Sequence, residues 1–206
     1  MKPTQLKKLA ALVIAGTAAM AVPQYAGAEQ TQVTGAGALS TGARLDFSIV
    51  IPRFLRFRVG TNAPATTVDQ ITFTVPGANV GDSSPVAGTG GDAGGTAANV
   101  SVVGNGGQIT ITEANNGGGL GLKHATLAEY INYNQIQTVS SDTVNLQRPI
   151  LTNAGGSTSL PVLNAGNVTN RSATWTYTYL NTTTPSAGTY GTNANGGRVT
   201  YTASMP

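Results

Sequence analysis

SATWTYTYLN, residues 172–181, is the stretch that decides the fold. Apolar and polar side chains alternate along it, and a period of two predicts a strand with one buried face. The first face carries Ala173, Trp175, Tyr177 and Tyr179, and the second carries Thr174, Thr176, Thr178 and Leu180. An aromatic face of this kind could stack on a sugar, but it is more often core, and we favour core.

The same alternation recurs along the chain. Residues 44–52, RLDFSIVIP, predict a half-buried strand that ends at Pro52, with Leu45, Phe47, Ile49 and Ile51 on one face. Three further strands are predicted: Leu55 to Val59 with a basic outer face, Ile71 to Val75, and Val199 to Met205. Residues 99–115 resemble a hairpin, because the NGG triplet at 105–107 is a strong turn signal.

The intervening segments give weaker signals. Residues 76–98 are rich in Gly, Ser, Ala and Asp and predict a long loop. Residues 125–130, ATLAEY, could form a single helical turn, and residues 160–166 a short edge strand in which Pro161 blocks a ladder bond. Many short strands with turn signals between them predict an all-β, antiparallel sandwich of about 7–9 strands, with a barrel as the alternative.

The N-terminus predicts export. Lys2, Lys7 and Lys8 precede an apolar stretch over 9–22, and residues 26–28, AGA, supply small residues for cleavage. This is the pattern of a secretory signal peptide, which we place at residues 1–28, with an uncleaved membrane anchor as the alternative. We expect the mature protein to start at Glu29 and to be secreted, passing through the periplasm to a bacterial cell surface or extracellular filament.

Charge and cysteine content fit an exported, self-associating chain. Three of the 11 basic residues lie in the predicted signal peptide, which leaves eight basic and eight acidic residues in the mature chain. A neutral, sparsely charged surface repels its own copies weakly. Cysteine is absent, so stability has to come from burial and strand pairing rather than from disulfides.

The residues offer little chemistry, and we expect no catalytic, metal or cofactor site. His124 is the single histidine, whereas a zinc site needs three or four ligands. The carboxylates are scattered, and Asp82 and Asp92 lack the ordered spacing of a calcium loop. A carboxylate pair formed only in space would still permit a secreted hydrolase. Nucleic-acid binding fits an exported, neutral chain poorly.

Two further segments are candidates for contacts with other molecules. Residues 29–43, EQTQVTGAGALSTGA, predict a flexible arm or an added strand. Arg53, Arg56 and Arg58 form a basic stripe with Phe54. The stripe is expected to be solvated or packed on a neighbour, and contact with an acidic glycan is the alternative.

The short arm ahead of the first strong strand, the Thr-rich alternating strands and the final strand GGRVTYTASMP together resemble bacterial fimbrial, pilin-like subunits. The resemblance implies an incomplete immunoglobulin-like sandwich, completed by a strand from a neighbouring subunit. It implies a homopolymer, with a periplasmic chaperone and an outer-membrane assembly protein as further partners. The contact residues would be Val33, Gly35, Gly37 and Leu39 of the arm, and Val199, Tyr201, Ala203 and Met205 of the recipient or chaperone edge.

Two functions therefore remain open at the level of sequence. The first is a structural subunit of a surface filament, assembled by strand addition of the N-terminal arm. The alternative is a self-contained secreted binding module for glycan or matrix adhesion, motivated by the Trp175 strand and the basic stripe.

Overall fold

A computed structural model describes residues 30–62 and 68–206. The predicted signal peptide and its cleavage position lie outside the described residues. The chain divides after Val50 into an N-terminal segment and a compact unit, Ile51–Pro206, whereas the sequence placed the start of the sandwich at residue 44. Each part is described by itself.

The compact unit is all-β, with antiparallel sheets and three short 3-10 turns, as predicted. Eleven strands are assigned over the described ranges, compared with the 7–9 expected, because several have only two or three residues. The strands are β1 (Leu55–Val59), β2 (Ile71–Phe73), β3 (Val86–Gly90), β4 (Ala97–Gly104), β5 (Thr110–Asn115), β6 (Leu122–Lys123), β7 (Tyr130–Ile131), β8 (Ile136–Ser140), β9 (Thr158–Ser159), β10 (Thr169–Tyr179) and β11 (Val199–Ser204). The 3-10 turns are η1 (Gly77–Asn79), η2 (Tyr133–Gln135) and η3 (Asn193–Asn195).

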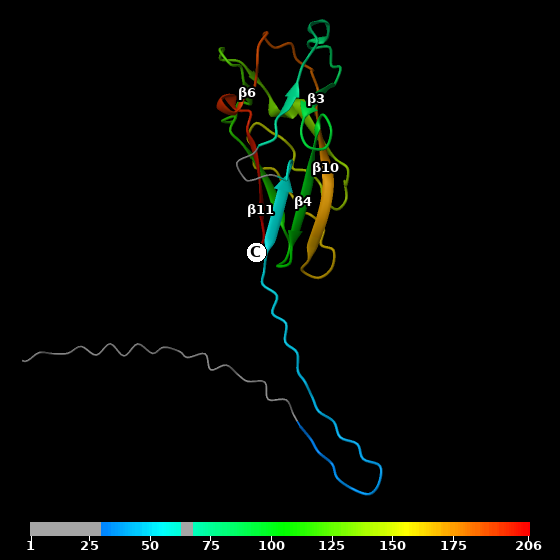
Figure 1. The fold of residues 1–206 in the computed structure, drawn as a ribbon. Coiled ribbons are helices and arrows are strands. Elements are labelled where there is room, and N and C mark those ends of the chain that lie inside the picture. Colours follow the sequence, from blue (N-terminus) through cyan, green and yellow to red (C-terminus); the bar gives the residue numbers. More distant parts are fainter. Residues whose placement is uncertain (1–29, 63–67) are drawn as a thin grey trace, which may run out of the picture. The chain divides into compact units, whose positions relative to one another are not determined.

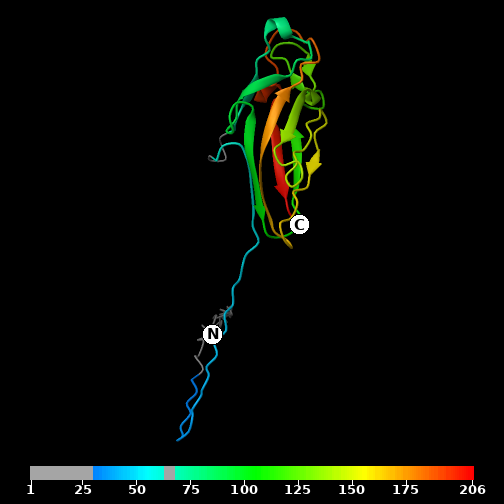
Figure 2. The ribbon, with the colours of Figure 1, turned by 90° about the vertical axis from the view of Figure 1, so that its right-hand side faces the viewer.

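Two sheets form the layers of the sandwich (Figure 1). The larger sheet has the order β1-β4-β10-β3-β2, with β8 paired to β10, and the smaller has the order β11-β5-β9. Strand β10 runs through the larger sheet, where it pairs with β4 over eight residues and with β8 over five (Figure 2). Strands β6 and β7 form a separate two-stranded sheet.

The core lies between these two sheets. The inward side chains of β4, Val100 and Val102, are fully buried, and so are Ile109 and Ile111 around the start of β5. Trp175 of β10 is also fully buried and meets Tyr201 of β11 edge-on, with ring centroids 5.1 Å apart. The aromatic face of residues 172–181 is therefore core, as favoured from the sequence, and it offers no platform for sugars.

The predicted hairpin over 99–115 is wrong in its pairing. Both strands form, but β4 belongs to the larger sheet and β5 to the smaller one. The turn at 105–107 therefore carries the chain from one layer to the other. This arch lets the apolar faces of both strands point into the same core, whereas a hairpin would have kept them in one sheet.

Three local predictions also need correction. The predicted loop 76–98 contains β3, whose Gly88 faces Phe73 of β2 across the ladder. The predicted edge strand over 160–166 is not a strand, and the short strand β9 lies just before it. Residues 125–130 form no helical turn and lead into β7. No helix in the described ranges is both long and apolar enough to cross a membrane.

The half-buried strand predicted over 44–52 is absent. No strand is assigned there, and each of these residues is exposed. The alternation is real, but within one chain nothing among the described residues pairs with this segment in a sheet.

Candidate functional site

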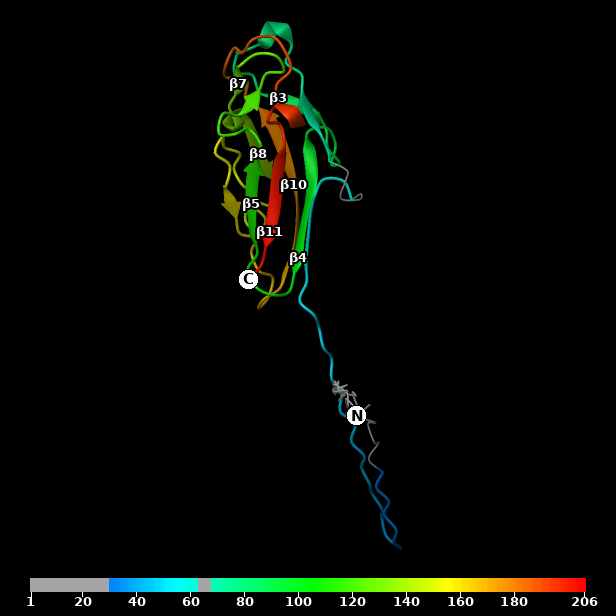
Figure 3. The ribbon, with the colours of Figure 1, turned by 90° about the vertical axis from the view of Figure 1, so that its left-hand side faces the viewer.

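The most unusual feature of the compact unit is an edge at which both sheets end on a long strand. Within the described part of the chain, strand β1 pairs only with β4, and β11 pairs only with β5. Strands β1 and β11 contact each other at this edge, yet no ladder joins them (Figures 1 and 3). One side of each backbone is therefore left unpaired, and such a row of N–H and C=O groups can accept another strand.

The inward side chains at this edge are only half covered. On β11 they are Val199, Tyr201 and Ala203, followed by Met205, and all four are half-buried. On β1, Phe57 and Val59 are half-buried and Leu55 is 36% exposed. All of these except Leu55 pack against the core. The edge thus presents apolar surface that continues the core outward.

Tyr201 ties β11 to the interior. Its ring lies edge-on against Trp175, and its hydroxyl is 3.3 Å from the hydroxyl of Tyr177. Burial, together with the neighbouring Tyr177 and Glu113, raises the pKa of Tyr201 well above the usual value for a phenol. The edge strand is thus anchored to the core at its centre while its outer backbone stays unpaired.

A network of hydrogen bonds fixes the chain just before β1. The Asn105 side chain accepts a hydrogen bond from the Phe54 N–H at 2.9 Å and donates one to the Pro52 carbonyl at 2.9 Å. Arg53 donates to the Gly106 carbonyl at 3.2 Å. The Gly106 N–H in turn donates to Met205 Sδ at 3.2 Å. The start of β1 and the end of β11 therefore meet at the arch between β4 and β5.

The N-terminal segment, residues 30–50, has two unlike parts. In the first part the chain bends at 36–37, and the Thr31 hydroxyl donates to the Gly42 carbonyl at 2.8 Å. The Leu39 side chain lies over Gly35, where an added Cβ would be 3.2 Å from Leu39 Cδ2. In the second part, residues 43–50, the chain contains no bend and every residue is exposed.

The two predicted sets of contact residues have different surroundings. Val199, Tyr201, Ala203 and Met205 share the inward face of one edge, as the sequence suggested. Val33 and Leu39 are exposed, and they lie in the part of the segment that bends back on itself. The role of both sets in assembly stays a prediction.

Sequence reasoning missed the contribution of β1 and of residues 45–51 to exposed apolar surface. The signal was present, because residues 45–51 carry a large apolar side chain at every second position, whereas 33–39 has glycine at two of the four. A periodic pattern alone could not reveal that this segment has no strand partner among residues 30–62 and 68–206.

His124 has a structural role. Its Nδ1 accepts hydrogen bonds from the N–H groups of Thr126 and Leu127, at 3.1 and 3.0 Å, and Nε2 lies 3.1 Å from the Ala187 carbonyl. Both ring nitrogens are thus engaged by the backbone. Glu129 accepts from the Ser186 N–H, and hydrogen bonds from Ser186 lower the pKa of the Glu129 carboxyl. This cluster holds the loops around residues 124–129 and 186–190 together.

The acidic residues singled out for calcium are used locally. Asp82 accepts from the Asn79 side chain at 2.8 Å and from the Ser84 N–H at 2.7 Å, and these bonds lower its pKa. Asp92 accepts from the N–H of Asn99 at 2.7 Å. Within the described ranges, no group of three or more His, Cys, Asp or Glu side chains could hold a metal ion.

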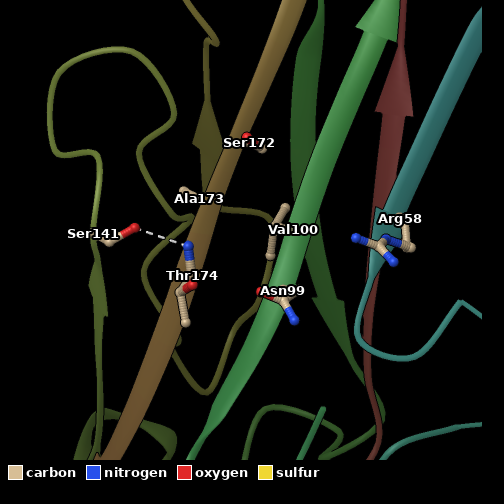
Figure 4. A pocket seen from close by; sticks show the side chains of 7 residues that line it. All are labelled: Arg58, Asn99, Val100, Ser141, Ser172, Ala173 and Thr174. Carbon is tan, nitrogen blue, oxygen red and sulfur yellow. Dashed lines mark hydrogen bonds between the residues drawn. The ribbon is translucent and has the colours of Figure 1, made fainter. Parts of the chain in front are cut away.

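Of the basic stripe, Arg58 borders a shallow hollow of about 290 Å³ on the outer face of the larger sheet (Figure 4). Arg58 is the one charged residue of its lining, and Ser141 accepts a hydrogen bond from the Thr174 N–H at 2.9 Å. The remaining lining residues are Asn99, Val100, Ser172 and Ala173. A single cation in an open hollow would bind a glycan only weakly. The lining contains no carboxylate or histidine for acid–base chemistry.

Comparison with known proteins adds no identity to this geometry: no family model, no curated protein and no solved structure matches the chain.

Proposed function

We propose that this chain is a structural subunit of a filament on a bacterial surface, and that copies join by strand addition. The N-terminal segment of one copy completes the sandwich of the next. The observation that carries the proposal is that the described part of one chain contains both an apolar edge and an exposed apolar segment, and that neither has a further strand partner there. Apolar strands and apolar edges are both unfavourable in water, and pairing them across copies removes both costs.

Composition supports the same function. The eight basic and eight acidic residues expected in the mature chain balance, so identical copies approach each other without net repulsion. The resemblance of the arm and of the final strand to bacterial fimbrial subunits points the same way. It also motivates the proposals that the chain is exported and that a periplasmic chaperone covers the edge before assembly.

The glycan-binding alternative depended mainly on an exposed aromatic face on the Trp175 strand. Trp175 is fully buried, and Tyr177 and Tyr179 are 8% and 6% exposed, so these rings cannot stack on a sugar without unfolding the core.

The test compares the chain beginning at Glu29 with a version that lacks residues 29–50. Size-exclusion chromatography over a range of concentrations, followed by negative-stain electron microscopy, should show filaments or large oligomers for the longer chain. The shorter chain should remain monomeric. Compact monomers from both proteins at every concentration would remove the filament proposal.

A further inference from the structure

We infer that the strand that joins copies is residues 45–51, rather than residues 33–39, and that it pairs along β11 of a second copy. This inference rests on the proposed function and specifies its contact.

The donor is identified by its apolar face. Phe47 and Ile49 are 85% and 84% exposed, and Leu45 and Ile51 are 66% and 73% exposed on the same face. Val33 and Leu39 are 46% and 52% exposed, and the positions between them on that face are glycines, which have no side chain to bury. Residues 45–51 therefore gain more from burial in a sandwich.

Backbone geometry gives the same assignment. A strand that adds to a sheet edge must be extended over its whole length. Residues 33–39 contain the bend at 36–37 and lie between Thr31 and Gly42, whose hydrogen bond closes a loop. Thr41 also donates to the Thr31 carbonyl at 3.1 Å. Residues 45–51 contain no bend and can pair without breaking such contacts.

The acceptor is identified by length and by its half-covered face. Edge strands β9 and β2 have two and three residues, so they offer little to pair with. Among the described residues, β8 has five residues and pairs only with β10, but its inward side chains Thr138 and Ser140 are buried, so it has no half-covered apolar face. Strand β11 has six residues, and β1 has five but carries the charges of Arg56 and Arg58 on its outer face. At about 3.3 Å per residue, β11 and residues 45–51 both span roughly 20 Å.

The two faces also match in number. Four alternate apolar side chains of the donor face four half-buried ones of the acceptor: Val199, Tyr201, Ala203 and Met205. The opposite face of the donor carries Asp46, Ser48 and Val50, which would then point to solvent. A register shift of one residue would bury Asp46, so the pattern specifies the register.

We assign the acceptor β11 to a second copy because hydrogen bonds fix the residues that follow the donor segment in its own chain. To reach its own β11, the chain would have to reverse between Ile51 and Leu55. Pro52 and Phe54 are fixed there by the Asn105 side chain, and Arg53 by the Gly106 carbonyl. Self-completion would break these bonds, whereas addition to another copy keeps them.

Two variants of the chain from Glu29 test the pairing. The donor-defective variant carries Phe47→Asp and Ile49→Asp, and the acceptor-defective variant carries Ala203→Asp. Each alone should remain monomeric, and their mixture should give a one-to-one dimer, because only one intact donor and one intact acceptor remain. A matched control with Val33→Asp and Leu39→Asp should form filaments like the unmodified chain.

A second measurement protects the test if Ala203→Asp prevents folding. A peptide of residues 43–53 with a photo-crosslinker at position 48 is added to the folded donor-defective variant. Trypsin cleavage after Arg198 releases residues 199–206, which contain β11, as one fragment. The crosslink should be found on this fragment, and a peptide carrying Phe47→Asp and Ile49→Asp should give none.

The outcomes separate the inference from the proposed function. Crosslinking to a strand other than β11 overturns the assignment of the acceptor. Filaments that survive Phe47→Asp with Ile49→Asp but disappear with Val33→Asp and Leu39→Asp overturn the assignment of the donor, while the filament function stands. An unmodified chain that never assembles overturns the filament function itself.

Discussion

Val100 of β4 and Val59 of β1 are partners in the same ladder, with the same side chain on the same face of the sheet, yet their surroundings differ. Val100 is fully buried, because β4 has a strand on either side and the smaller sheet beneath it. Val59 is half-buried, because β1 has a single strand neighbour among the residues that the structure describes. The burial of an inward residue in this sandwich thus depends on how many strands flank it. At the β1/β11 edge, the described residues supply no further strand to cover the inward side chains.

The largest difference between the closed core and the exposed apolar surface should be in the free energy of unfolding that is lost when an aromatic ring is removed. Trp175→Ala leaves a cavity in the fully buried core and should lower the free energy of unfolding by about 3–5 kcal/mol. Phe47→Ala removes a ring that is 85% exposed and should change the stability of the monomer by less than about 0.5 kcal/mol. Urea denaturation of both variants at a concentration that keeps the protein monomeric measures the difference.

Phe47→Ala, which should leave the stability of the monomer almost unchanged, should have a clear effect on assembly. Phe47→Ala should weaken filament formation without loss of folded monomer, if residues 45–51 join the copies. A large loss of monomer stability on Phe47→Ala would instead place this ring in the chain's own core and contradict its exposed position.

A second, smaller effect should arise from protons held in the core. Tyr133 is fully buried, its hydroxyl donates to the Gly196 carbonyl, and burial raises its pKa to about 12, with Glu113 adding to the rise. Below pH 10 both folded and unfolded chains hold this proton. Between pH 10 and 12 the unfolded chain releases it first, so the free energy of unfolding should fall, by roughly 1–2 kcal/mol.

Thermal unfolding across this pH range, with phenolate absorbance recorded in parallel, measures the effect. Tyr133→Phe removes the proton together with the hydrogen bond, so this variant should be less stable at neutral pH but should lose less stability above pH 10. An unchanged pH dependence in Tyr133→Phe would assign the alkaline loss to the other tyrosines with raised pKa: Tyr177, Tyr179, Tyr190 and Tyr201.

The sequence was sufficient for the strands that find a partner within the chain. Residues 172–181 and 199–205 alternate, and residues 172–179 and 199–204 form strands with the expected inward faces. The four apolar residues of the recipient edge lie together for the same reason. Periodicity identifies the side of a strand that seeks burial, and this information is local.

Partners are not local, and this is where sequence reasoning failed. Residues 45–51 alternate as well as β10 does, but alternation does not say whether the partner lies in the same chain. The NGG turn at 105–107 fits a hairpin, yet the need to bury both Val102 and Ile109 in one core makes it an arch. Strand β3 was missed because its sequence, VAGTG, contains two glycines and therefore suggests a loop. Gly88 is needed in this strand because an added Cβ would lie 2.6 Å from Ile71 Cγ2.

The smallest predicted difference in unfolding free energy is the one between the two paired valines, Val100 and Val59. Val100→Ala should lower the free energy of unfolding of the monomer by about 2–3 kcal/mol, since two methyl groups and their packing are lost from a fully buried position. Val59→Ala should cost only about 1 kcal/mol in the monomer, because water already reaches that side chain. In the filament, where an added strand would cover Val59, the same change should raise the protein concentration needed for assembly roughly fivefold. Equal losses of monomer stability at the two positions, with assembly unchanged, would mean that the β1/β11 edge is already closed within the single chain.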